Sequence, residues 1–234
     1  MRSYEVTAEF YDILHAPEYL KLAERVLTSW LGSPRLAVLD VGAGTGLDTV
    51  ALAARCRVPI HAVEPAASMR AVLLSRLSGQ LDLLERVTVH AAPMEQLGLT
   101  RMADFALCLN LLGTLDADQR RGTLAALARA LVAGGRLVVQ PPPERPGPPR
   151  ADLPSWRLGE ERYGGEATCE RVDGDRLRWR FRYRVTRGDR IVREETEAFD
   201  GFLVPAPRFA AELTAAGFTI EAHDAPDLLI ARLV

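Results

Sequence analysis

Apolar residues fall in short runs that alternate with stretches of helical spacing, and this alternation is typical of an α/β fold. Runs of four to six residues are too short for stable helices, so we expect them to form strands. The five predicted parallel strands are 37–40, 59–64, 87–90, 104–109 and 136–140. Between them, apolar positions three and four residues apart predict helices, among them 67–78 and 117–132, the latter ended by Gly134-Gly135.

Two further runs close the chain. Residues 218–222 and 228–233 are separated by a short connection, which makes them antiparallel neighbours. With the five parallel strands they predict a seven-stranded, mostly parallel sheet that has an antiparallel last strand and helices on both faces.

The N-terminal segment is helical in its spacing but contains a proline. Apolar positions in residues 3–31 predict two helical pieces, and Pro17 divides them because proline removes a helix hydrogen bond.

A second segment departs from the strand–helix repeat. Residues 141–154 contain seven prolines and predict a stiff loop. Residues 176–185 then alternate Arg with apolar residues, which is the pattern of a half-buried strand. Turn signals on either side predict flanking strands at 163–172 and 190–199. We therefore expect an inserted antiparallel β meander, a cap spanning 155–200.

The arginine row could indicate nucleic-acid binding, but the local charge balance weighs against it. Residues 157–197 hold 11 Arg against 10 Asp and Glu. We expect the arginines to pair across strands with Glu194, Glu195 and Glu197.

Composition limits the function classes further. The chain has 234 residues, a net charge of −2 and 48% hydrophobic residues, which fit one domain spanning 1–234. This balance gives no reason to expect nucleic acid or an anionic membrane as partner, and no apolar run approaches the ~18 residues of a membrane span. The N-terminus has no apolar signal segment, and the three cysteines are odd in number and scattered. We expect reduced thiols and a cytoplasmic protein.

The clearest chemical signal follows the first predicted strand. Asp40 precedes Gly42, Gly44 and Gly46, and a helix-forming run begins directly after them. Glycines allow close approach to a ligand, and a helix N-terminus offers unpaired N–H groups. The dinucleotide fingerprint requires glycine where this chain has Leu47, and a carboxylate at Asp40 repels pyrophosphate but attracts an ammonium group. The pattern favours an amino-acid nucleoside over NAD.

Two residues at other strand ends extend this site. Glu64 ends the second strand, 18 residues after Gly46, where a carboxylate accepts hydrogen bonds from ribose hydroxyls. Asn110 leaves the carboxyl end of the fourth strand, where it either faces a ligand or caps the next turn.

These motifs resemble those of the class I S-adenosylmethionine-dependent methyltransferases, especially small-molecule enzymes of natural-product and amino-sugar type. The resemblance covers residues 37–140 and 205–234. It implies a Rossmann-like fold and S-adenosylmethionine as cofactor, with S-adenosylhomocysteine as product. It also implies methyl transfer to an N or O atom of a small-molecule acceptor, which we expect in secondary metabolism.

The resemblance assigns individual cofactor contacts. Residues 1–34 become a helical lid in which Tyr11 either reaches the methionine end of the cofactor or serves only in packing. Pro65 and Met69 match positions beside the adenine, whereas Pro93 stands where the family often has Asp. Adenine recognition then falls to backbone groups near Met94. The full set is Tyr11, Asp40, Gly42, Ala43, Gly44, Gly46, Glu64, Pro65, Met69, Pro93, Met94 and Asn110.

Methyl transfer from a sulfonium requires positioning and a proton acceptor, and it requires no metal. The sequence has no His/Cys/Asp cluster with ligand spacing, so no metal site is expected. His15, beside Tyr11, is the candidate base, and Asn110 is the second candidate catalytic residue. His61 and His90 lie in predicted strands and are expected to be structural.

The inserted meander is expected to cover the acceptor or to form a homodimer surface. Its aromatic residues Trp156, Trp179, Phe181 and Tyr183 suit a bulky, partly apolar acceptor. The sequence leaves the acceptor and the methylated atom undefined. Two alternatives stay open: a cofactor-binding cyclase or lyase that does not methylate, and a nicotinamide oxidoreductase.

Overall fold

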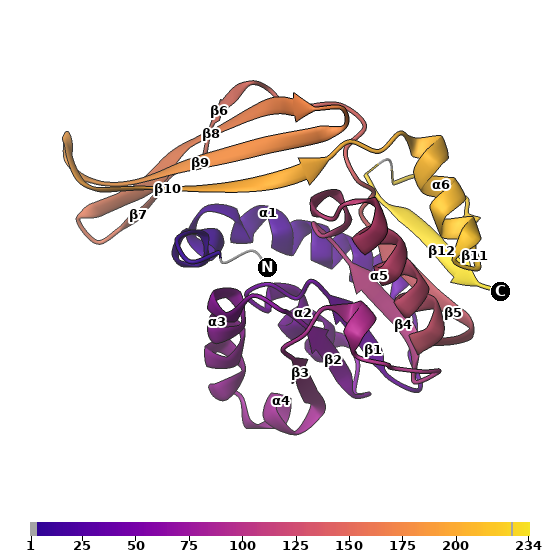
Figure 1. Ribbon diagram of the computed structural model, residues 1–234. Helices are drawn as coiled ribbons and strands as arrows, with labels where there is room; N and C mark the ends of the chain where they lie inside the picture. The colour runs from indigo at the N-terminus through magenta and orange to yellow at the C-terminus, as the bar shows by residue number, and fades with distance from the viewer. Residues whose placement is uncertain (1–3, 226) are drawn as a thin grey trace.

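The computed structural model describes residues 4–225 and 227–234, and the larger of its two sheets has the predicted seven strands (Figure 1). Their order in the sheet is β11-β12-β5-β4-β1-β2-β3. The strands are β1 (Val38–Val41), β2 (Ile60–Val63), β3 (Val87–His90), β4 (Ala103–Cys108), β5 (Leu131–Val139), β11 (Phe218–Glu221) and β12 (Leu229–Leu233). The first five pair in parallel, and β12 pairs antiparallel with both β5 and β11. The predicted sheet, including its antiparallel last strand, is confirmed.

Helices cover both faces of this sheet, because alternate residues of each buried strand point to opposite sides. On β1, Val38 packs in a cluster with Leu52 and Leu73, whereas Leu39 packs in another with Leu127. The helices are α2 (Leu47–Arg55), α3 (Ala67–Ser78), α4 (Leu81–Arg86), α5 (Ala117–Ala130) and α6 (Ala206–Ala215), with short 3₁₀ helices η1 (Met94–Gln96) and η2 (Leu112–Thr114).

The N-terminal segment differs from the prediction. A single helix, α1 (Thr7–Trp30), runs through Pro17 where we expected two pieces. Proline removes one helix hydrogen bond, but tertiary contacts hold the two halves in line. The first half buries Phe10 against Tyr183 of the inserted sheet, and the second half buries Val26 and Leu27 in the core.

The end of α5 also differs. The helix stops at Ala130, and Leu131 already pairs with Ala103 as part of β5. The Gly134-Gly135 pair therefore lies inside the strand. Gly134 has φ +76°, and the register shifts by the time Arg136 pairs with β4, so the glycines form an irregularity in β5 and not a helix cap.

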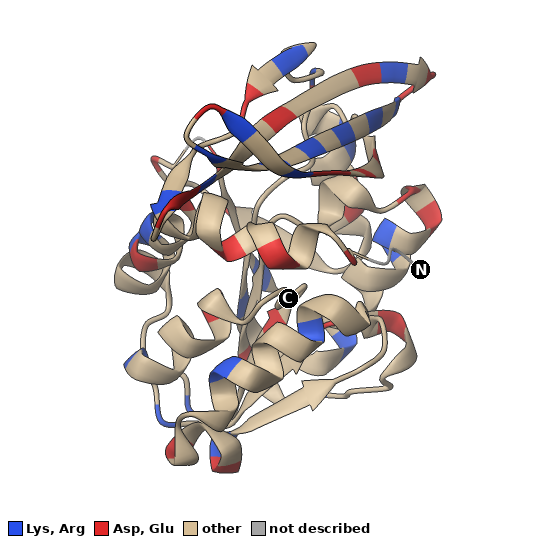
Figure 2. Ribbon diagram, turned by 90° about the vertical axis from the view of Figure 1, so that its left-hand side faces the viewer, with Lys and Arg blue, Asp and Glu red and all other residues tan. Residues whose placement is uncertain are grey.

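The inserted segment folds into a second, antiparallel sheet above α1 (Figure 1). It contains β6 (Arg150–Asp152), β7 (Trp156–Leu158), β8 (Glu161–Asp173), β9 (Arg176–Arg187) and β10 (Arg190–Phe202), and we call β8–β10 the meander. Charges of both signs alternate along its strands (Figure 2).

The predicted pairing of the arginine row is correct only in part. Glu194 lies opposite Arg184 and binds it, with Nε and Oε2 2.6 Å apart. Glu195 and Glu197 lie opposite Tyr183 and Phe181, on the apolar face. The reason is the two-residue period of the strand, which places neighbouring glutamates on opposite faces.

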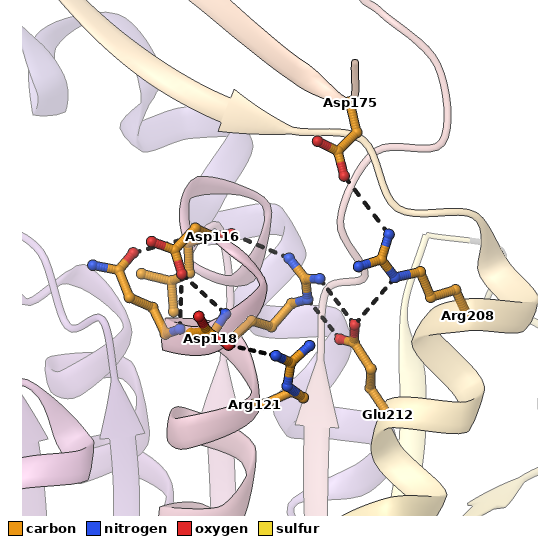
Figure 3. Close-up of polar contacts among 9 residues, drawn as sticks. Asp116, Asp118, Arg121, Asp175, Arg208 and Glu212 are labelled. Atoms are coloured by element: carbon orange, nitrogen blue, oxygen red, sulfur yellow. Dashed lines mark hydrogen bonds and ion pairs between the residues drawn. The ribbon is translucent and has the colours of Figure 1, made fainter. Parts of the chain in front are cut away.

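A buried ion pair fastens α6 to α5 beside the meander (Figure 3). Arg120 is 1% exposed and donates to both oxygens of Glu212, at 2.6 and 2.9 Å, and to the carbonyl of Leu115. Glu212 also lies 3.6 Å from Arg208, which lies 3.7 Å from Asp175 in the β8–β9 turn. Breaking such a buried pair on one side leaves an uncompensated charge, so this contact fixes the relative position of three elements.

Candidate functional site

A cavity of about 1720 Å³ opens at the carboxyl ends of β1, β2 and β4. Its floor is formed by the loops that leave these strands, one side by α1, and its far wall by the meander. This is where ligands bind in open α/β sheets. Its volume exceeds the ~300–1,000 Å³ of a typical small-molecule pocket, so there is room for two ligands side by side.

The three glycines of the turn each have a positive φ, at +83° for Gly42, +56° for Gly44 and +84° for Gly46. A Cβ on Gly46 would lie 2.3 Å from Leu73 Cδ1, so this glycine is required for packing. Gly42 and Gly44 line the cavity, whereas Gly46 and the buried Ala43 do not. The backbones of Gly42 and Gly44 therefore face a ligand, whereas Gly46 allows the turn to pack closely against Leu73 of α3.

Glu64 follows β2 and holds the turn in place. Its Oε2 accepts from the Gly44 N–H at 2.8 Å, and its Oε1 accepts from the Ala66 N–H at 2.7 Å. Burial raises the pKa of this carboxyl, and the two backbone donors act in the opposite direction. Each carboxylate oxygen keeps acceptor capacity, and Glu64 lines the cavity, so it can still accept from ribose hydroxyls as expected.

Asp40 lies behind the cavity wall. Its side chain is 2% exposed, it does not line the cavity, and Oδ2 accepts from the Thr49 hydroxyl at 2.5 Å. Burial, reinforced by the charge of Asp48, raises the pKa of Asp40 to about 8. Any attraction of Asp40 for an ammonium group therefore acts through the glycine turn and without direct contact.

Asp48 was missed by sequence reasoning, although a carboxylate two residues after the last glycine was a visible signal. It lies in the first turn of α2, and burial raises its pKa to about 6. Among the described residues, its buried Oδ1 has no hydrogen-bond partner. Asp40, Asp48 and Glu64 thus place three carboxyls with raised pKa values beneath the turn, and a cationic ligand favours their ionised forms.

An apolar slot lies beside the turn. Pro65, Met69, Pro93 and Met94, which the resemblance placed near the adenine, all line the cavity. Met69 and Met94 are buried, so they form a fixed wall. The slot is suited to a flat heteroaromatic ring.

Three aromatic residues one helical turn apart on α1 close the cavity from the side. Tyr11 and His15 have ring centroids 5.9 Å apart, and His15 and Tyr19 have centroids 5.6 Å apart. All three line the cavity, which brings together Tyr11 and His15 as predicted and adds Tyr19, which the sequence reading overlooked. Burial raises the pKa of Tyr11 and lowers the pKa of His15, so the imidazole is neutral and able to accept a proton near neutral pH.

Helix α1 is tied to the glycine turn by its own aspartate. Asp12 Oδ1 accepts from the Thr45 hydroxyl at 2.6 Å, and Oδ2 pairs with Arg76 of α3. This contact holds the aromatic face of α1 over the turn.

Asn110 lines the cavity from the end of β4. Its φ of +53° is uncommon for a residue other than glycine, and its backbone N–H donates to Gln140 Oε1 at 3.0 Å. Strained backbone of this kind concentrates at functional sites. The structure thus places Asn110 on the cavity surface, close to the glycine turn and α1.

The far wall comes from the meander. Trp179, Phe181, Tyr183 and Phe199 line the cavity, and Phe181 and Phe199 have ring centroids 5.8 Å apart. Trp156 is 47% exposed and does not line the cavity, so our expectation that it faces the acceptor is wrong. It lies in the short strand β7, which pairs with the outer end of β8.

Polar side chains surround this aromatic wall. They are Glu95, Asp116, Gln119, Glu144, Arg145, Arg178 and Asp200. His61 and His90, which bond to each other at 2.9 Å between Nδ1 and Nε2, do not line the cavity. Among the described residues no group of three or more His, Cys, Asp or Glu could hold a metal ion, and none of the helices described is long and apolar enough to span a membrane.

The residues present fit a sulfonium amino-acid nucleoside. Glu64 suits the ribose, the Met69–Met94 slot suits the base, and the carboxyls beneath Gly42 and Gly44 suit the cationic amino-acid end. A dinucleotide fits less well, because its pyrophosphate would lie over buried carboxyls.

Comparisons with known proteins agree with this fit. Residues 38–135 match the family described as "Methyltransferase domain". No curated protein matches the sequence.

Solved structures share the fold. CalS10, an amino pentose methyltransferase from Micromonospora echinaspora, is 24% identical with a TM-score of 0.68, covering 93% of this chain and 91% of its own. The sugar N-methyltransferase KedS8 from a Streptoalloteichus species is 24% identical with a TM-score of 0.71, covering 92% and 86%. DesVI from Streptomyces venezuelae is 18% identical with a TM-score of 0.78, covering 97% and 96%.

The sequence match and the fold agree with each other. Residues 38–135 are similar to a methyltransferase domain, and the chain shares its fold with the methyltransferases CalS10 and KedS8.

Proposed function

We propose that this enzyme transfers a methyl group from S-adenosylmethionine to the nitrogen of a small-molecule amine, an amino sugar or related natural product. One observation supports the proposal above the others. A single cavity joins the cofactor cradle at Gly42 and Gly44 to the aromatic wall of Phe181 and Phe199, and the neutral His15 lies on it as well.

The cradle holds the cofactor through two sets of contacts. Glu64 accepts from the ribose, and the slot of Pro65, Met69 and Met94 packs on the adenine. Tyr11 lies over the methionine end from α1. The bound cofactor supplies an electrophilic methyl on a sulfonium, which a nucleophile displaces directly in line.

His15 acts as the proton acceptor for the amine. An acceptor amine is protonated in water, and it must lose that proton before its lone pair can attack. Burial lowers the pKa of His15, so the ring is uncharged and its free nitrogen lone pair can take the proton. An ammonium group is a far stronger acid than an alcohol, so an imidazole of lowered pKa takes its proton more readily, which favours N over O transfer.

The acceptor end attracts a cation and orients it. On the cavity surface Glu144 offers its carboxylate to the ammonium group, because Asp116 caps α5 and Asp200 pairs with Arg176 and Arg178. Phe181 and Phe199 exclude water around the reacting atoms and give an ammonium-bearing ring an aromatic face. Asn110, between the two ligands, positions the acceptor.

Proteins of the same fold support the acceptor class, since CalS10 is an amino pentose methyltransferase and KedS8 is a sugar N-methyltransferase. The cap at 155–200 supplies the acceptor side, and the lid at 1–34 the cofactor side. Exposed Trp156, Leu158 and Ile191 at the outer end of the inserted sheet form a homodimer surface in this proposal. The free, buried cysteines fit a reducing cytoplasmic setting.

A labelling experiment tests the proposal. Purified protein is incubated with methyl-labelled S-adenosylmethionine and pairs of nucleotide sugars that differ only in carrying an amino or a hydroxyl group. We expect label on nitrogen in the amino member of a pair. Label on oxygen alone contradicts the N assignment, and conversion of an acceptor without label supports a non-methylating cyclase or lyase.

A further inference from the structure

Glu197 of β10 lies opposite Phe181 on the apolar face of the meander, and its carboxylate contacts the start of α1. Its Oε1 accepts from the Glu5 N–H at 3.0 Å, and its Oε2 accepts from the Thr7 N–H at 2.7 Å. Val6, the residue that precedes α1, makes no side-chain cap of its own. The cap of this helix therefore comes from β10, 190 residues along the chain from Thr7.

A carboxylate is well suited to this role. The first turn of a helix has N–H groups with no partner inside the helix, and its dipole is positive there. Glu197 satisfies one such group, the N–H of Thr7, and also accepts from the N–H of Glu5 just before the helix. A cap of this kind stabilises a helix start, and here it also attaches that start to a different sheet.

Further contacts orient the capped turn on the meander. The Thr7 hydroxyl lies 3.0 Å from the Tyr183 hydroxyl, and the Phe10 ring stacks on Tyr183 with centroids 4.6 Å apart. Arg193 of β10 pairs with Glu9 and lies over the Phe10 ring.

The other side of the same turn rests on the cofactor cradle. Ala8 packs with Ala66 and Met69, and Tyr11 packs against that cluster. A single turn of helix is thus placed between the acceptor wall above and the adenine wall below, and Glu197 fixes its end.

We propose that Glu197 is a positioning residue for methyl transfer, which caps α1 from the acceptor-side sheet and so holds Tyr11 and His15 over the reacting groups. The inference rests on the proposed function and adds that acceptor binding is coupled to the position of α1. Glu197 belongs to the same strand as Phe199, so a ligand that contacts this wall also stabilises the closed position of the cofactor lid.

Glu197→Gln tests the inference, because the carboxamide keeps the shape but has one acceptor oxygen in place of two. Glu194→Gln is the matched control, because Glu194 lies on the opposite face of the same strand, where it pairs with Arg184. The probe is S-adenosylhomocysteine, whose dissociation rate is followed by stopped-flow fluorescence. Hydrogen exchange of the amides of residues 5–11 is measured in parallel.

We expect Glu197→Gln to accelerate ligand dissociation about tenfold and to speed exchange in residues 5–11, as loss of a helix cap would. Glu194→Gln should match the wild type in both. Glu197→Asp, which keeps two acceptor oxygens, should recover part of the slow dissociation, and this conservative rescue separates positioning from general stability.

The inference is overturned if Glu197→Gln and the wild type release the ligand at the same rate, or if exchange rises evenly across the whole chain. Failure of the proposed function has a different signature, because the wild type itself would then not bind S-adenosylhomocysteine.

Discussion

Glu64 Oε2 and the Gly44 amide nitrogen lie 2.8 Å apart, so the carboxylate that we propose for the ribose also holds the glycine turn. The second oxygen of Glu64 accepts from Ala66, which leads into α3. One side chain thus ties β2 to the turn after β1 and faces the cavity at the same time. Sequence spacing indicated the ribose role, but the bond to Gly44 depends on the parallel pairing of β1 with β2.

Replacing Glu64 should therefore weaken both the ligand and the turn. For Glu64→Gln we expect affinity for S-adenosylhomocysteine to fall about 10- to 100-fold, since each lost charge-assisted hydrogen bond costs ~1.5–3 kcal/mol. Titration calorimetry measures the change. Glu85→Gln, on the exposed side of α4, is the control, and an unchanged affinity in Glu64→Gln would remove this residue from the site.

Cofactor affinity should depend on pH through Asp40 and Asp48. Their pKa values are raised from 3.8 to about 8 and about 6, so the empty site carries protons that a cationic ligand displaces. Affinity for S-adenosylmethionine should rise between pH 6 and 8, with proton release seen as a dependence of the binding heat on the buffer. Proton uptake over this range would contradict the electrostatic role of the pair.

The raised pKa values of Asp40 and Asp48 also determine how the stability of the protein changes with pH. A folded-state pKa raised above the unfolded value gives stability that is present at low pH and is lost as pH rises through the folded pKa. The ligand-free protein should thus lose melting temperature as pH increases through about 6 and about 8, and Asp40→Asn should flatten the upper part of that trend. Thermal unfolding followed by circular dichroism checks both.

His15→Gln should separate chemistry from binding. Loss of a general base costs about 100-fold or more in kcat, while the affinity for S-adenosylhomocysteine should stay within about twofold. In the wild type, burial lowers the pKa of His15, so kcat should stay level down to pH values below 6.5 and fall once the ring is protonated. Equal kcat in the variant and the wild type would show that the amine loses its proton to solvent.

Two glycines of the turn should respond differently to alanine. Both have positive φ, but a Cβ at Gly46 meets Leu73 at 2.3 Å, whereas at Gly44 the nearest atom is 3.9 Å away. Gly46→Ala should cost ~2–5 kcal/mol of unfolding free energy from strain and overpacking, and Gly44→Ala only ~1–2 kcal/mol from its backbone angle. Urea unfolding compares the two, and equal losses would contradict the packing argument.

The sequence predicted the main sheet well because its strands are short apolar runs. It also indicated that Glu64 would lie at the ligand-binding edge of the sheet, because the carboxyl ends of parallel strands meet in space. The resemblance placed Met69 and Met94 beside it, and all three residues line the cavity. Both errors in helix ends came from local signals that tertiary contacts overrode, at Pro17 and at Gly134.

Other parts of the site had no signal in the sequence. Whether Asp40 contacts the ligand depends on burial, and its bond to Thr49 places it behind the wall. The cap that Glu197 provides joins strands and helix across nearly the whole chain, and no local pattern reports such a contact. The position of Trp156 outside the cavity depends on which edge of β8 its strand pairs with.

Titration calorimetry of the wild-type protein with S-adenosylhomocysteine, and separately with NAD, decides whether the glycine turn binds a methyltransferase cofactor. We expect one S-adenosylhomocysteine bound per chain, with affinity lost in Glu64→Gln, and no heat of binding with NAD. Binding of NAD, or no binding of S-adenosylhomocysteine by the folded protein, would contradict the assignment of the site.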